Sequence, residues 1–298
     1  MWKIYCSFAK SENSFIEMKK SPKILILGAT GMLGHTVYKY LKNIFKNSVL
    51  GTSRNNFDCY NYQQALPELF STHNPKYIIN CIGILRKSSS SKDMLFINGE
   101  FPHILFKYSK KYSFNIIHVS TDAVFRKTSG LVNEDSKASP NDDYGLSKLS
   151  GEVKNDNVLN VRTSILGFDP THHKGLFEWL LKNKSKTISG FTNQLWSGCT
   201  TLQLAQFVNW IISEKNFQKL RKISHVFHFP AIGPITKYEI LKSFIRVSKQ
   251  DTVIKKSKGR KITRTLITKY ANEIDLNSYK RSVDDTIREL FIFEQRQL

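Results

Sequence analysis

The chain has 298 residues, 40% of them hydrophobic and 23% charged, and it carries a formal net charge of +21 at pH 7. This composition is ordinary for a globular protein and excludes a chain that is disordered throughout, and the length allows one large or two small domains. No apolar run approaches the roughly 20 residues that span a bilayer, so we expect no membrane-spanning segment.

The first half of the chain is predicted to alternate between strands and helices. Residues 23–27 (KILIL) form a short apolar run that predicts a buried strand. Apolar residues at Leu33, Val37, Leu41 and Phe45 then have the spacing of a helix with one buried face. Further strands are expected at residues 48–51, 77–82, 115–119 and 158–161, and helices at 95–112 and 144–153. The alternation predicts an α/β fold with a Rossmann-type doubly wound parallel sheet.

The second half of the chain is predicted to add a smaller domain. Helices are expected near residues 176–182, 202–212 and 237–247. We therefore expect an N-terminal extension (1–21), a ligand-binding Rossmann domain (22–165) and a mainly substrate-binding C-terminal domain (166–298), part of which can return to the Rossmann sheet. Ligands of such folds bind at the carboxyl ends of the parallel strands.

A glycine-rich turn, GATGMLG, follows the first predicted strand. Glycines at positions 28, 31 and 34 permit a tight turn, close approach of backbone N–H groups to a pyrophosphate, and close packing of the helix on the strand. The spacing is GxxGxxG rather than GxGxxG, and a plain glycine turn is the simpler alternative. The position between a strand and a helix favours a dinucleotide site, for which we expect contacts from Gly28, Thr30, Gly31, Met32 and Leu33.

The segment after the second predicted strand indicates which dinucleotide binds. NAD sites usually place an Asp or Glu there to hold the ribose 2′-hydroxyl, whereas NADP sites offer a cation to the 2′-phosphate. Here the segment LGTSR has no carboxylate and ends in Arg54, whose guanidinium can bind a phosphate with two hydrogen bonds. NADPH is therefore the expected cofactor and NADH the alternative; a solvated Arg54 is the simpler interpretation.

Two short segments together favour a catalytic site. Tyr144 and Lys148 begin the helix predicted at residues 144–153 and are four residues apart, so they share one face. A tyrosine has a pKa near ~10, and a lysine cation nearby favours its phenolate, which brings proton transfer toward the working pH range. Ser120 and Thr121 follow the strand predicted at 115–119, where a hydroxyl can bind a substrate carbonyl oxygen.

The cysteines and histidines predict neither a disulfide framework nor a metal site. Cys6, Cys59, Cys81 and Cys199 form no CxxC pair and have no histidine at metal-ligand spacing. A reducing, cytoplasmic compartment fits this pattern best.

Five segments occur in the order typical of extended short-chain dehydrogenases/reductases: GATGMLGH, INCIGI, VSTDAVF, YGLSKLSGE and RTSILG. Over about residues 22–215 the chain resembles the dTDP-4-dehydrorhamnose reductase-like branch of that family. The resemblance implies NADPH-dependent reduction of the 4-keto group of a nucleotide-linked 6-deoxy-hexose, in deoxysugar biosynthesis for surface glycans. It is compatible with a homodimer.

By position, the resemblance also implies roles for individual residues. Tyr144 would donate a proton to the C4 oxygen as NADPH delivers hydride to C4. Lys148 would hold the nicotinamide ribose and tune Tyr144, Thr121 would orient the carbonyl, and Asn98 would support the site. Further cofactor contacts are expected from Asp58, Cys81, Ile82 and Gly83, and substrate contacts from Ser120, Thr121, Arg162 and Trp196. For Arg162 and Trp196 a purely structural role is an equally good interpretation.

Two segments depart from the branch. Ala123 stands where many relatives have an aromatic residue, which predicts a wider or differently shaped sugar pocket. Residues 190–201 are more similar to reductases of UDP-linked 2-acetamido-2,6-dideoxy sugars. Both dTDP-4-dehydrorhamnose-like and UDP-2-acetamido-2,6-dideoxy-hexulose substrates therefore stay open.

Other functions remain as alternatives. An epimerase on the same scaffold is compatible with the motifs, whereas a dehydratase is disfavoured because Asp122 is followed by Ala123 rather than Glu. A non-catalytic regulatory subunit, like the β-subunit of methionine adenosyltransferase, is disfavoured by the intact Thr121, Tyr144 and Lys148. Nucleic-acid binding is not favoured despite the charge, because the basic residues are spread along the chain and no recognition motif is present. The densest basic group, within residues 255–264, is expected to be a solvated segment.

Overall fold

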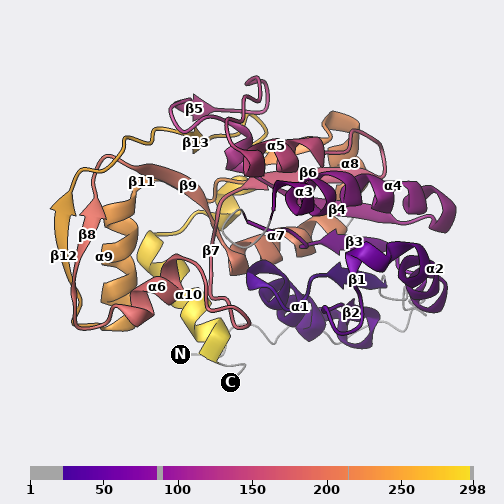
Figure 1. Cartoon of the computed structure of the whole chain (residues 1–298), viewed down its shortest axis with the longest axis horizontal. Helices are drawn as coiled ribbons and strands as arrows, with labels where there is room; N and C mark the ends of the chain where they lie inside the picture. The colour runs from indigo at the N-terminus through magenta and orange to yellow at the C-terminus, as the bar shows by residue number, and fades with distance from the viewer. Residues whose placement is uncertain (1–22, 86–89, 214, 296–298) are drawn as a thin grey trace, which may run out of the picture.

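The computed structural model describes residues 23–85, 90–213 and 215–295. The N-terminal extension expected at residues 1–21 lies outside these ranges. The described chain forms a larger lobe around a central sheet and a smaller lobe built mostly from the second half of the sequence (Figure 1). None of the helices in the described ranges is long and apolar enough to cross a membrane.

The larger lobe is built on a six-stranded sheet in which all neighbours are parallel. The strand order is β10-β6-β4-β3-β1-β2. From β1 the chain first moves to one edge and then returns through β3, β4 and β6 toward the other, which confirms the predicted doubly wound, Rossmann-type fold. The strands are β1 (Ile24–Leu27), β2 (Val49–Gly51), β3 (Tyr77–Asn80), β4 (Asn115–Thr121), β6 (Val158–Thr163) and β10 (Val226–His228).

Helices cover both faces of this sheet. Because successive side chains of a strand point to opposite faces, Ile24 and Ile26 contribute to one apolar core and Leu25 and Leu27 to another. The first core lies under α1 (Met32–Phe45), α7 (Thr201–Ile212) and α8 (Asn216–Ile223), and the second under α2 (Tyr62–His73) and α4 (Phe101–Tyr112). Both faces are therefore buried, which is why the strands are continuous apolar runs.

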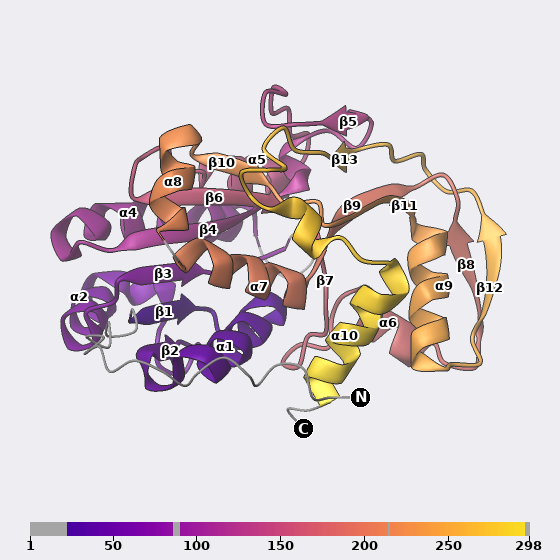
Figure 2. The same ribbon diagram turned by 180° about the vertical axis from the view of Figure 1, so that it is seen from behind.

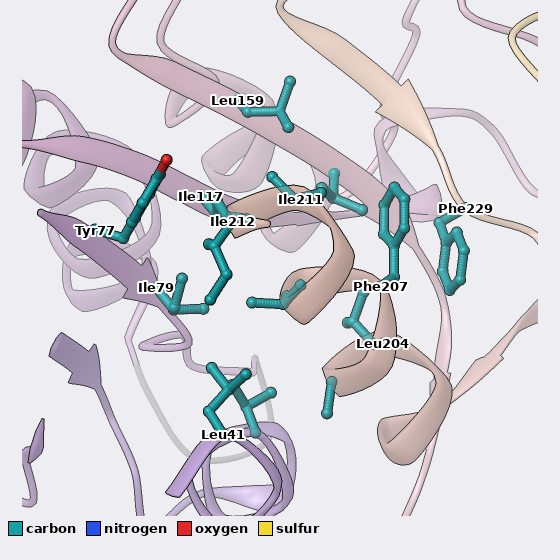
Figure 3. Packing of buried hydrophobic residues seen from close by; sticks show 14 of the residues in the cluster. Leu41, Tyr77, Ile79, Ile117, Leu159, Leu204, Phe207, Ile211, Ile212 and Phe229 are labelled. Carbon is teal, nitrogen blue, oxygen red and sulfur yellow. The ribbon is translucent and has the colours of Figure 1, made fainter. Parts of the chain in front are cut away.

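The helix α7 supplies much of the first core. Figure 3 shows Ile212 of this helix lying near Ile79 and Ile117 of the sheet, and Leu204 and Ile211 belong to the same core. Strand β10 follows soon after α7 and pairs with β6 at the edge of the sheet. Residues on both sides of position 165 thus build the larger lobe.

The smaller lobe combines short strands with helices (Figures 1 and 2). Helices α6 (Leu176–Lys182), α9 (Lys237–Ser248) and α10 (Val283–Gln295) contribute to a third apolar core that includes Phe177 and Phe244. One sheet has β7 (Ile165–Leu166), β9 (Leu195–Thr200) and β11 (Ile232–Thr236), and β8 (Thr187–Phe191) pairs with β12 (Val253–Ser257). From β12 the chain returns to the larger lobe, where β13 (Thr265–Leu266) pairs with β5 (Leu131–Val132).

Several boundaries differ from those expected. The helix expected at residues 95–112 begins earlier, with α3 (Ser91–Met94), and is divided into a π-helical turn (Leu95–Glu100) and α4. Asn98 in the π-helical turn hydrogen-bonds to both backbone groups of Ile84. The strand expected at 115–119 continues to Thr121. Helix α5 (Asp143–Ser150) is shorter than expected and ends where Gly151 packs on the π-helical turn; a Cβ there would lie 2.0 Å from the carbonyl oxygen of Asn98.

Candidate active site

The glycine turn between β1 and α1 has the geometry of an anion site. Gly28 has φ of +78°, a conformation that favours glycine, and a Cβ at Gly34 would lie 2.0 Å from the Gly28 carbonyl oxygen. Helix α1 begins at Met32, and within its described first turn no side-chain hydrogen bond caps the helix and no acidic residue is present. The uncapped N–H groups and the positive end of the helix dipole therefore fit a phosphate group.

The ends of β2 and β3 flank this turn. The backbone N–H of Gly28 donates to the Thr52 hydroxyl (3.2 Å), and a Cβ on Gly28 would lie 3.2 Å from the backbone nitrogen of Ile82. Arg54 and Asp58 are exposed on the loop after β2, where the Asp58 carboxylate caps a short 3-10 turn. The structure therefore places the expected cofactor residues along one edge of the sheet: Gly28, Thr30, Gly31, Met32, Leu33, Arg54, Asp58, Cys81, Ile82 and Gly83.

The start of α5 packs closely on the end of β4. A Cβ on Gly145 would lie 2.3 Å from the Ala123 carbonyl oxygen, so only glycine permits this approach. Tyr144 is thereby brought to Thr121. Burial raises the pKa of Tyr144 to about 12, and a hydrogen bond with the Thr121 side chain opposes that rise. A phenol with this pKa stays protonated near neutral pH and can donate a proton.

Lys148 lies one helical turn further along α5 and is only 4% exposed. Its Nζ donates to the Val119 carbonyl oxygen (2.7 Å) and lies 3.4 Å from Nε2 of His118. Burial lowers the pKa of Lys148 to about 8, while the Glu152 carboxylate opposes this shift. The structure therefore brings the three expected catalytic side chains to one end of the same helix and strand.

Arg162 and Ser120 are engaged by a residue that sequence reasoning did not select, Glu152. The Arg162 guanidinium makes two hydrogen bonds to the Glu152 carboxylate (2.8 and 2.6 Å), and the Ser120 hydroxyl donates to the same carboxylate (2.6 Å). Arg162 also lies over the ring of Phe125, 5.2 Å from its centroid. Both charged groups are buried, so this cluster ties α5 to β4 and β6. The predicted contact of Arg162 with a substrate phosphate stays a prediction.

A second ion pair brings the C-terminal half of the chain to the end of β4. The Arg264 guanidinium donates from Nε to the Asp122 carboxylate (2.9 Å) and from Nη1 to the Phe125 carbonyl oxygen (2.8 Å). Lys237 lies close by: burial lowers its pKa, and the positive charges of Lys127 and Arg264 lower it further. Arg264 and Lys237 thus lie near the Asp122 carboxylate, which follows the expected catalytic residue Thr121, and Lys127 lies near Lys237.

The expectation that residues 255–264 form a solvated segment needs one correction. Lys255, Lys256, Lys258, Arg260 and Lys261 are exposed, but the Arg264 side chain is only 13% exposed and belongs to the site. The reason is the pairing of β13 with β5, which carries this residue back over the larger lobe.

Trp196, an expected substrate contact, and the cysteines have structural surroundings of their own. Trp196 is half-buried on β9, and its indole N–H donates to the Ser164 hydroxyl (2.8 Å). Cys59, Cys81 and Cys199 are free thiols, and Cys6 lies outside the described residues. The described part of the chain holds no group of three side chains that could bind a metal ion.

Solved structures share this fold. A dTDP-4-dehydrorhamnose reductase from Clostridium acetobutylicum matches with a TM-score of 0.74 at 24% identity, over 91% of this chain and 99% of the other. The enzyme of the same name from Bacillus anthracis, in complex with NADP, matches with a TM-score of 0.74 at 18% identity, also over 91% and 99%. At these identities the likeness concerns the fold.

Proteins with similar sequences, together with a family profile, show the family to which the chain belongs. A dTDP-4-keto-6-deoxy-D-glucose reductase of Streptomyces niveus is 25% identical over 234 residues, 75% of this chain and 77% of that protein. The β subunit of methionine adenosyltransferase 2 from Xenopus laevis is 36% identical over 143 residues, 44% of this chain, but the match spans less than half (42%) of that protein. The profile of the RmlD substrate binding domain matches residues 22–286, which is most of the chain. The chain therefore belongs to the RmlD substrate-binding-domain family, in agreement with the resemblance that its motifs indicate.

Proposed function

We propose that the protein catalyses the NADPH-dependent reduction of the 4-keto group of a nucleotide-linked 6-deoxy-4-keto-hexose. The observation that carries this proposal is the contact of Tyr144 with Thr121, with Lys148 one turn along the same helix. Reduction of a ketone adds a hydride to the carbonyl carbon and a proton to its oxygen. The hydride comes from the dinucleotide when it is bound, and the Tyr144 phenol supplies the proton.

Other residues would bind and orient the two ligands. The glycine turn would hold the pyrophosphate, since its backbone leaves no room for a Cβ at Gly34 and leaves N–H groups of α1 uncapped. The exposed Arg54 would bind the 2′-phosphate and so favour NADPH over NADH. Lys148 would bind a ribose hydroxyl, and the Thr121 hydroxyl would hold the keto oxygen beside Tyr144.

The positive charge near Asp122 supports a substrate that carries phosphate. Lys127, Lys237 and Arg264 together outnumber the Asp122 carboxylate, which lies near Lys237 and Arg264. Excess positive charge in a partly buried site favours an anion, and a nucleotide sugar carries a diphosphate. The relative from Streptomyces niveus is by name a reductase of such a sugar, and one from Haloferax volcanii, 29% identical over 191 residues, is by name a probable glycan biosynthesis reductase.

The main alternative is a regulatory subunit, which the match to the methionine adenosyltransferase subunit suggests. The contact of Thr121 with Tyr144 and the buried Lys148 favour catalysis instead. An epimerase would keep the dinucleotide bound and would consume none of it.

The proposal is tested by mixing the purified protein with NADPH and a panel of dTDP- and UDP-linked 4-keto-6-deoxy sugars, and following NADPH absorbance. We expect consumption with one class of sugar and its loss in Tyr144→Phe, while the matched control Tyr112→Phe on α4 keeps wild-type activity. Consumption that is the same in Tyr144→Phe would contradict the assigned role. No consumption by folded protein that binds NADPH would favour the regulatory subunit.

A further inference from the structure

A row of buried polar side chains crosses the central sheet beneath α5. Asn80, His118 and Asn160 are register partners on β3, β4 and β6, so they point to the same face of the sheet. Each is at most 1% exposed. Lys148 reaches this row from α5, because its Nζ lies 3.4 Å from Nε2 of His118. The central member of the row, His118, therefore faces the Lys148 amine.

The hydrogen bonds of Asn80 fix the tautomer of His118. The backbone N–H of Ile82 can only donate, so the Asn80 atom that it contacts at 3.2 Å is the amide oxygen. The amide nitrogen, a donor, then lies 3.1 Å from Nδ1 of His118, which must accept. Burial holds the pKa of His118 well below its usual value, so the ring is neutral. A neutral imidazole whose Nδ1 accepts carries its proton on Nε2, the atom that faces Lys148.

An N–H group that faces Nζ disfavours the charged form of Lys148. An ammonium group has three donors and no acceptor, so it meets the His118 N–H donor to donor. A neutral amine instead accepts this hydrogen with its lone pair and still donates to the Val119 carbonyl oxygen (2.7 Å). We propose that His118, oriented by Asn80, is a positioning residue that makes the Lys148 proton exchangeable during turnover, in place of a permanent cation.

Charged groups on neighbouring elements shift the pKa values of Lys148 and His118, some upward and some downward. Burial lowers the pKa of Lys148 to about 8, whereas Glu152, two residues after the end of α5, and Cys81 after β3 raise it. On α4, His103 adds to the effects of burial and of Lys148 in lowering the pKa of His118. The His118 N–H therefore acts in the same direction as burial and against Glu152.

The role of this arrangement in turnover, but not the arrangement itself, rests on the proposed function. When Tyr144 gives its proton to the keto oxygen, the O–H bond breaks and the phenolate keeps the electron pair. Lys148 would then return a proton from Nζ to the Tyr144 phenolate oxygen. Its side chain would be left as a neutral amine, which regains a proton from solvent. A lysine with an ordinary pKa near ~10.4 would give up its proton far less readily at neutral pH.

The protonation of Lys148 can be measured in the full chain without any ligand. Lysine side chains labelled with carbon-13 at Cε are titrated by NMR, and the Lys148 signal is identified by its disappearance in Lys148→Met. We expect a wild-type midpoint near pH 8. In Asn80→Asp the new carboxylate accepts from Nδ1, the ring proton moves there, and Nε2 becomes an acceptor for the ammonium. The proton affinity of Lys148 should then rise by about tenfold or more.

A double-mutant comparison separates the tautomer from the added charge. His118→Phe removes the opposing N–H and should raise the Lys148 midpoint, and Asn80→Asp made in that background should shift it much less than in wild type. The NMR spectra of both variants also show whether they are folded. A wild-type midpoint near that of free lysine, or an equal effect of Asn80→Asp with and without His118, would overturn the proposal. A protein that shows the expected shifts but reduces no sugar would disprove the proposed reaction and leave the assignment of His118 intact.

Discussion

Lys148→Met removes a buried charge that the fold holds at a cost. The pKa of Lys148 is about 8 in the folded protein against 10.5 for a free lysine, which corresponds to about 3 kcal/mol of unfavourable free energy at pH 7. Methionine fills nearly the same volume without charge. The substitution also removes the hydrogen bond to the Val119 carbonyl oxygen, which costs about 1 kcal/mol. The variant should therefore be more stable than wild type by about 2 kcal/mol at pH 7.

The pH dependence has a definite sign. The pKa is lowered in the folded state, so the penalty is fully present below about pH 8, where both states carry the proton. Between pH 8 and 10.5 the unfolded chain binds more protons than the folded one, and wild-type stability rises with pH relative to the variant. The advantage of Lys148→Met should therefore shrink above pH 8 and disappear near pH 10.

The assay is urea unfolding followed by tryptophan fluorescence, at pH 7 and again near pH 10. Lys107→Met, at an exposed position of α4, is the matched control and should change the free energy of unfolding by less than about 0.5 kcal/mol. A Lys148→Met protein that is less stable than wild type at pH 7, or whose advantage is the same at both pH values, would refute the reasoning. Sugar reduction should be lost in this variant, although it is the more stable protein.

Three further changes test other parts of the site. Arg162→Met leaves the Glu152 carboxylate buried without its ion pair and should lower the free energy of unfolding in urea by about 3–5 kcal/mol; a loss below about 1 kcal/mol would show that the pair is not structural. Gly34→Ala places a Cβ 2.0 Å from a backbone oxygen of the glycine turn and should weaken NADPH binding at least about tenfold in a fluorescence titration; unchanged affinity would contradict the assigned turn. Thr171→Val removes a 2.6 Å hydrogen bond to the Thr30 carbonyl oxygen, so amide hydrogens of residues 169–175 should exchange faster, whereas equal exchange would show that the bond does not hold this loop.

The central fold could be predicted because its signals are local. The strands of a sheet covered on both faces are continuous apolar runs, and α1 shows its buried stripe in the spacing of Leu33, Val37 and Leu41. Helix α2 was not expected, since it contains Pro67 and buries little beyond Leu66 and Phe70. The strands of the smaller lobe are short and pair with distant segments, so a periodic pattern in the sequence does not predict them.

The candidate site likewise contains residues that local motifs predict and contacts that depend on segments far apart in the sequence. Thr121, Tyr144 and Lys148 could be selected because Thr121 ends a strand and the other two lie four residues apart on a short helix, where local motifs are readable. The contact between Asp122 and Arg264 spans 142 positions and depends on the pairing of β13 with β5, which local patterns do not encode. The π-helical turn at Leu95–Glu100 was hidden for a related reason, because its width depends on tertiary packing rather than on helix propensity.

The chain crosses between the two lobes repeatedly: after β6, between β9 and α7, after β10, and from β12 to β13 (Figure 2). Any movement of one lobe relative to the other must bend several of these connections together, which favours small shearing movements over the wide swing of a single hinge. These crossings also affect how the chain folds while it is being synthesised. A nascent chain that ends before residue 201 has α1 but lacks both α7 and β10, so part of one face of the sheet and its β6 edge stay uncovered until the later segments emerge. The larger lobe is therefore expected to complete its fold late, together with the smaller lobe.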